Sequence, residues 1–105
     1  MIYVYNFSDN TLTAIPEVSS VEQAREHMMQ FLNQNSAVYS YVDKYGIVYE
    51  EDTPVCYYLT DEDEFEFEIG TIGQLLDEEP LTADNHQSLS CLEKVYTHLV
   101  NEYIY

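Results

Sequence analysis

Basic side chains are almost missing from this sequence. Arg25, Lys44 and Lys94 stand against 20 aspartates and glutamates, so the formal net charge is −17. A protein that binds nucleic acid directly carries a basic surface for the phosphates, so we do not expect direct nucleic-acid binding. Self-repulsion of this size destabilises a compact chain, and the acidity therefore requires an explanation.

Glycine, cysteine and histidine are too few or too scattered to form the usual sites. The three glycines make no phosphate-binding loop, and no serine stands in a nucleophile elbow. Cys56 and Cys91 lack the paired spacing of zinc ligands, and no histidine has a second ligand at a useful spacing. The acidic run 61–66 fails as a calcium loop, because Phe65 and Glu66 stand where Asp or Asn and Gly are required. We therefore expect no cofactor, no metal site and no catalytic residue, and a protein that is not an enzyme.

Long apolar runs are missing as well. No stretch reaches the length that spans a membrane, and residues 1–7 carry no basic n-region. These absences predict neither export nor membrane insertion. We expect a cytoplasmic protein in which Cys56 and Cys91 are buried free thiols.

What is present is enough for one folded domain. Apolar and aromatic residues make up 46% of the 105 residues, including eleven tyrosines and four phenylalanines, which argues against disorder. A chain of this length leaves no room for a second independent core. We therefore expect a single domain over residues 1–105.

Two hairpins are predicted in the first half of the chain. Residues 2–7 and 11–15 are β-prone and flank a polar turn. Residues 37–42 and 47–49 form the second pair, and Gly46 ends the turn between them, where a positive φ is needed.

A helix over Val21–Asn33 separates these hairpins. Its apolar residues recur at helical spacing, and Ser19 or Ser20 can cap it together with Glu22 or Gln23. The predicted apolar face consists of Val21, Ala24, Met28, Phe31 and Leu32.

The second half is predicted to contain two more strands. Residues 55–60 read as one strand, and Glu64–Ile69 alternates glutamate with apolar residues, as a half-buried antiparallel strand does. In that strand Phe65, Phe67 and Ile69 would face the core.

Two helical segments follow. A short capped helix is expected over 71–76, and a longer one over 85–103, where apolar residues repeat every three or four positions. Together these elements predict an α+β fold with an antiparallel sheet of four to six strands packed against two main helices.

The carboxylates are segregated along the chain. No lysine or arginine occurs from Tyr45 through Glu93. Ordinary surfaces intersperse both signs of charge, so this segregation exceeds what solubility requires. Twelve carboxylates between positions 50 and 79 are the expected partner-binding residues: Glu50, Glu51, Asp52, Asp61, Glu62, Asp63, Glu64, Glu66, Glu68, Asp77, Glu78 and Glu79.

Three of these glutamates would form a regular row on the predicted strand. Alternate strand residues lie about 6.6 Å apart, so Glu64, Glu66 and Glu68 would approximate the spacing of phosphates along one nucleic-acid strand. Glutamates on the outer face of a sheet are also ordinary binary patterning. The absence of lysine favours a functional role for these glutamates over ordinary patterning, because lysine would protect a sheet edge from aggregation equally well.

The expected partner is a positively charged nucleic-acid-binding protein, either a nuclease or a guide-RNA effector complex. An acidic surface can fill the basic groove of such a protein. Tyrosines such as Tyr49, Tyr57 and Tyr58 could anchor the contact or could equally belong to the core, and at least one of Tyr57 and Tyr58 must face inward. In composition and size the chain resembles the DNA-mimic inhibitors of phages and plasmids, the anti-restriction and acidic anti-CRISPR proteins. That resemblance implies a bacterial host cytoplasm and a target whose nucleic-acid channel is occluded.

Two other functions remain open from the sequence. An immunity or antitoxin protein that neutralises a basic nuclease would also carry clustered carboxylates and exposed aromatic residues. An acidic assembly module would use its charge only for solubility. A homodimer through the C-terminal helix is a further expectation, although repulsion between two chains of charge −17 opposes it.

Overall fold

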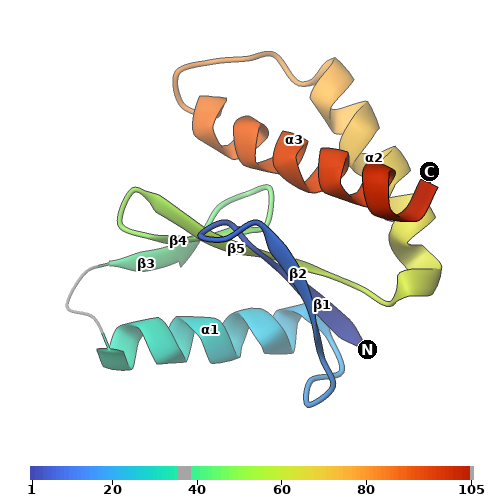
Figure 1. Ribbon diagram of the computed structural model, residues 1–105. Coiled ribbons are helices and arrows are strands. Elements are labelled where there is room, and N and C mark those ends of the chain that lie inside the picture. The colour runs from blue at the N-terminus through green and yellow to red at the C-terminus, as the bar shows by residue number, and fades with distance from the viewer. Residues whose placement is uncertain (36–38, 105) are drawn as a thin grey trace. The chain divides into compact units, whose positions relative to one another are not determined.

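A five-stranded antiparallel sheet and three α-helices make up the structure, a computed structural model that describes residues 1–35 and 39–104 (Figure 1). This confirms the expected α+β class with its antiparallel sheet. The chain divides into two compact units, residues 1–61 and 62–105, which are described separately below. That all 105 residues form a single domain stays a prediction.

The first unit contains the whole sheet, with the strands in the order β2-β1-β5-β4-β3. All neighbouring pairs are antiparallel, and the two hairpins predicted from the sequence are confirmed as β1–β2 and β3–β4. Of the predicted strand 37–42, residues 37 and 38 lie outside the described residues. The observed strands are β1 (Ile2–Asn6), β2 (Thr11–Ile15), β3 (Ser40–Val42), β4 (Ile47–Glu50) and β5 (Thr53–Leu59).

Helix α1 (Val21–Asn35) packs against one face of this sheet (Figure 1). The side chains between them form a closed apolar core, because strand residues of one face alternate inward and meet the apolar stripe of the helix. Of the predicted helical face, Phe31 is exposed, and Met29 packs against the core instead. The buried members of this core are Ile2, Val4, Val18, Ala24, Leu32, Val48, Cys56 and Tyr58.

The start of α1 is fixed by the predicted serine cap. The Ser20 hydroxyl oxygen accepts a hydrogen bond of 3.1 Å from the Gln23 backbone N–H. The Gln23 side-chain oxygen in turn accepts from the backbone N–H of Ser19 at 3.0 Å. The Ser20 bond thus satisfies one helix-terminal donor, and Gln23 also ties down the residue before the cap, in an arrangement close to a capping box.

The turn between β3 and β4 also forms as the sequence predicts. Gly46 has φ +94°, a conformation that side-chain-bearing residues rarely adopt. The Asp43 carboxylate closes the turn by accepting hydrogen bonds of 2.9 Å from the backbone N–H groups of Tyr45 and Ile47. The Arg25 guanidinium lies over Gly46, so a Cβ at this position would come within 2.5 Å of Nη2. The positive φ is therefore what requires glycine here, since the flexible end of the Arg25 side chain could move away from a Cβ.

The regular elements described in the second unit, within residues 62–104, are all helical. The unit begins with a 3₁₀ turn, η1 (Glu62–Glu64), and continues as α2 (Phe65–Glu78), α3 (His86–Leu99) and a short π-helix, η2 (Val100–Ile104). The predicted C-terminal helix is confirmed over most of its length by α3, which buries Leu89, Leu92, Val95 and Leu99.

The strand predicted at Glu64–Ile69 is wrong, because these residues begin helix α2. Phe65 is 2% exposed whereas Phe67 is 71% exposed, so the two phenylalanines do not share a face. The buried positions Phe65, Ile69 and Ile72 instead follow the helical spacing of four and three. Six alternating residues are too few to reveal the helical period of about 3.6 residues. That period continues through residues 71–76, which were predicted as a separate short helix.

Cys56 is fully buried on β5, beneath α1. Burial raises the pKa of its thiol from 9.0 to about 11, although a hydrogen bond with Tyr58 and the charge of Arg25 act in the opposite direction. Burial likewise raises the pKa of the Tyr58 hydroxyl, and the neighbouring Cys56 adds to that shift. The fold therefore favours the protonated form of both groups.

Alkaline pH should consequently destabilise the protein through Cys56. The unfolded thiol loses its proton near pH 9 and the folded thiol near pH 11, so stability is intact below pH 9 and falls as pH rises between these values, by about 3 kcal/mol. Denaturant titrations at several pH values should show this fall in wild type. In Cys56→Ala, which is less stable throughout, the curve should be flatter over that window, and parallel curves would contradict the assignment.

Candidate functional site

The twelve predicted partner-binding carboxylates fall in both structural units. Each unit is strongly acidic by itself: the first has nine carboxylates against two basic residues, and the second has eleven against one. The first unit holds Glu50, Glu51, Asp52 and Asp61, and the second holds Glu62, Asp63, Glu64, Glu66, Glu68, Asp77, Glu78 and Glu79.

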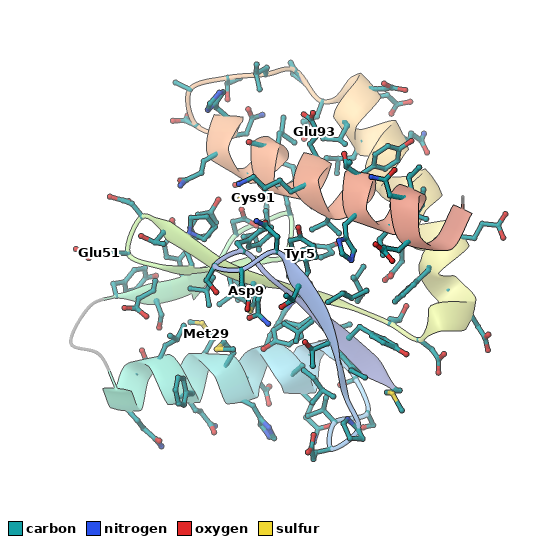
Figure 2. All side chains as sticks on the ribbon, viewed as in Figure 1. Tyr5, Asp9, Met29, Glu51, Cys91 and Glu93 are labelled. Carbon is teal, nitrogen blue, oxygen red and sulfur yellow. The ribbon has the colours of Figure 1, made fainter. Side chains whose placement is uncertain are left out.

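Glu51 and Asp52 form the turn between β4 and β5, and Glu50 is the last residue of β4 before it. Glu51 has φ +58°, a left-handed conformation that glycine or asparagine would adopt at lower cost. Its side chain is exposed and projects from the turn (Figure 2). The backbone of the turn is fixed by a hydrogen bond of 2.7 Å from the Glu51 N–H to the Tyr39 carbonyl oxygen.

A stack of three tyrosines lies beside this acidic turn. Tyr41 on β3 is the cross-strand partner of Tyr49 on β4, and their rings stack with centroids 5.1 Å apart at an interplanar angle of 7°. The Tyr39 ring stacks on Tyr41 at 5.5 Å and 23°. Burial raises the pKa of the Tyr41 hydroxyl, and the charges of Asp52 and Asp43 raise it further, so both carboxylates act on this ring. We call Tyr39, Tyr41 and Tyr49 with the acidic turn Glu50–Asp52 the tyrosine platform.

Asp61 lies at the end of the first unit and is held by an ion pair. Its Oδ2 atom is 3.3 Å from the N-terminal amino group of Met1. This pair is about half exposed on both sides, so its net contribution to stability is small.

The second unit gathers carboxylates at the start of α2. Asp63 and Glu64 belong to the 3₁₀ turn, and Glu66 and Glu68 lie in the first turn of the helix. The predicted row with strand spacing does not form, because successive helical residues are rotated by about 100°. Negative charge at a helix N-terminus is stabilised by the helix dipole, so these positions need no functional explanation.

The other end of α2 is acidic as well, against the preference of the helix. Asp77 and Glu78 lie in its last turn and Glu79 caps it, and the last turn contains no basic residue. Carboxylates here lie at the negative end of the helix dipole, and each such charge destabilises the helix by ~0.3–1 kcal/mol. One local compensation is a hydrogen bond of 3.2 Å from the Gln74 side-chain nitrogen to Glu78.

The η1–α2 segment carries a charge density like that of one DNA strand. Positions 62–79 contain eight acidic residues and no basic residue. At the helical rise of 1.5 Å per residue they extend over about 27 Å, or about 3.4 Å per charge, and one strand of B-DNA has the same average axial spacing. The helix places these charges in two groups at its ends rather than in an even row.

Of the tyrosines that the sequence offered either as contact anchors or as core residues, two belong to the core. Tyr49 and Tyr58 are buried and Tyr57 is half-buried, whereas Tyr39 is 73% exposed and Tyr41 is half-buried. The register of the β3–β4 hairpin contained the missing signal, because a turn ending at Gly46 places Tyr41 opposite Tyr49.

Within residues 1–35 and 39–104 no group of three His, Cys, Asp or Glu side chains could hold a metal ion. None of the helices described there combines the length and apolar character needed to cross a membrane. Comparison with family models, with curated proteins and with solved structures gave no match to this chain.

Proposed function

We propose that this protein inhibits a positively charged nucleic-acid-binding protein by occupying its DNA- or RNA-binding groove. The observation that carries the proposal is the placement of carboxylates where they cost stability. Glu51 adopts a left-handed backbone conformation, and Asp77, Glu78 and Glu79 oppose the dipole of α2. Residues that break local preferences are expected at functional sites.

The charge of both units supports the same function. A basic groove attracts an acidic protein at long range and exchanges its bound counterions for carboxylates, as it does for phosphates. Because each unit is acidic by itself, the attraction does not depend on one particular face. A nuclease or a guide-RNA effector complex of a bacterial host has such a groove, so the inhibitor would be an anti-restriction or anti-CRISPR protein of a phage or mobile element, acting in the cytoplasm.

Capture from a bacterial lysate tests this proposal. The immobilised protein is incubated at low salt with a lysate freed of nucleic acid, and bound proteins are eluted first with duplex DNA or RNA and then with raised salt. We expect a basic nuclease or effector complex that elutes with nucleic acid and is identified by mass spectrometry. Partners that resist both elutions would contradict occupation of a nucleic-acid groove.

The immunity or antitoxin function is the second candidate, and one observation favours it. The carboxylates form separate groups at a turn and at the two helix ends rather than an even row, which suits a surface shaped to one toxin. The same experiment separates the two functions, because an immunity protein bound outside the groove of a nuclease would be released by salt and not by nucleic acid.

A further inference from the structure

The tyrosine platform combines a flat aromatic surface with carboxylates. The rings of Tyr39, Tyr41 and Tyr49 form a continuous stack along the β3–β4 hairpin, with centroid separations of 5.5 and 5.1 Å. Tyr49 is buried at one end of the stack, and Tyr39 is 73% exposed at the other. An exposed aromatic face at the end of a supported stack is a rigid surface for a second planar group.

Negative charge lies directly beside this surface. Asp52 and Asp43 are close enough to act on the Tyr41 hydroxyl, and the Glu51 N–H is bonded to the Tyr39 carbonyl oxygen. Asp43 already closes the β3–β4 turn through two backbone N–H groups. Glu51 and Asp52 are exposed.

We propose that the tyrosine platform binds an arginine side chain of the partner protein, with the guanidinium stacked on the outer face of Tyr39 and paired with Glu51 or Asp52. Guanidinium is the planar cation of proteins: it stacks on aromatic faces and donates paired hydrogen bonds to a carboxylate. A nucleic-acid base would stack equally well, but its phosphates would be repelled by a chain of charge −17. Charge complementarity therefore selects a cation as the occupant.

This inference rests on the proposed function and names one contact within it. Arginine is the common phosphate-binding residue of nucleic-acid-binding grooves. The platform would engage an arginine that otherwise contacts the phosphate backbone. The platform thereby supplies a specific short-range interaction, whereas the total charge of the protein supplies the long-range attraction.

The probe is the peptide acetyl-Gly-Arg-Gly-amide, and its matched control carries citrulline, which has the same shape without the charge. Binding is followed by NMR on the full-length protein through the aromatic signals of Tyr39 and Tyr41 and the backbone amides of Glu51 and Asp52. We expect saturable shifts confined to these residues at millimolar arginine peptide, and at least about fivefold weaker binding of the citrulline peptide.

Two pairs of variants separate the platform from general acidity. Tyr39→Ala should weaken arginine binding about threefold, whereas Phe67→Ala, which removes an exposed aromatic residue of the second unit, should leave it unchanged. Glu51→Gln/Asp52→Asn should weaken binding about fivefold, whereas Asp84→Asn/Glu102→Gln removes the same charge elsewhere and should weaken it less than about twofold.

Equal binding of both peptides, or equal losses in the two double variants, would overturn the platform. The proposed function is decided separately, by capture of a partner that nucleic acid elutes. If the captured partner binds Tyr39→Ala with the same affinity as wild type, the platform is removed and the function is kept. If Tyr39→Ala binds that partner at least about threefold more weakly, both are supported.

Discussion

Replacement of Phe65 with alanine will lower the free energy of unfolding by about 3–5 kcal/mol, and the same replacement at Phe67 will lower it by less than about 0.5 kcal/mol. The difference follows from burial: the Phe65 side chain is 2% exposed at the start of α2, and Phe67 is 71% exposed two residues later. A helix separates these positions by about 200° of rotation, whereas a strand would place both on one face.

Urea unfolding followed by circular dichroism measures both values. Phe67→Ala is the internal control, because it removes the same ring from the same turn of helix. Similar losses from both replacements would mean that the two phenylalanines share a buried face, and the helical assignment of residues 65–69 would then be wrong.

Charge reversal at the C-terminal end of α2 should raise stability and weaken partner binding together. In Asp77→Lys/Glu78→Lys, two unfavourable interactions with the helix dipole become favourable, so the free energy of unfolding should rise by about 1 kcal/mol. The net charge changes from −17 by four units to −13. Attraction to a basic groove should weaken with it, on the order of a hundredfold in affinity for the captured partner.

The matched control is Glu64→Lys/Glu66→Lys at the other end of the same helix. It produces the same net charge, but it places lysines at the positive end of the dipole and should lower stability by a similar amount. Thermal unfolding and affinity measured by surface plasmon resonance give the two quantities for each variant. Undiminished binding by both variants would show that the acidity of α2 does not contact the partner.

The sequence predicts local structure correctly where the backbone conformation requires a particular type of residue. The serine cap of α1 and the glycine at the end of the β3–β4 turn each satisfy a backbone condition that few residues meet. The serine cap allowed the start of α1 at Val21 to be predicted, and the glycine allowed the β3–β4 turn to be placed near Gly46. No backbone requirement of this kind marks the segment 64–69. Its six alternating residues match the periodicity of a strand, and the wider spacing of Phe65, Ile69 and Ile72 matches that of a helix equally well.

The candidate site could be predicted in charge but not in arrangement. The segregation of acidic residues is a property of the sequence alone. Their predicted geometry assumed a strand at residues 64–69. Because this segment begins a helix, Glu64, Glu66 and Glu68 do not form an even row. The tyrosine platform depends on cross-strand register and on a ring stack between Tyr39 and Tyr41, and side-chain stacking of this kind is decided by tertiary packing rather than by local pattern.

Displacement of nucleic acid from the captured partner tests the central claim most directly. A fluorescently labelled duplex is bound to that partner, and its anisotropy is followed at low salt as this protein is added. Occupation of the groove predicts a fall to the anisotropy of the free duplex at one equivalent of protein, with weaker displacement by Asp77→Lys/Glu78→Lys. A rise in anisotropy, which reports a complex of partner, duplex and this protein together, would contradict it.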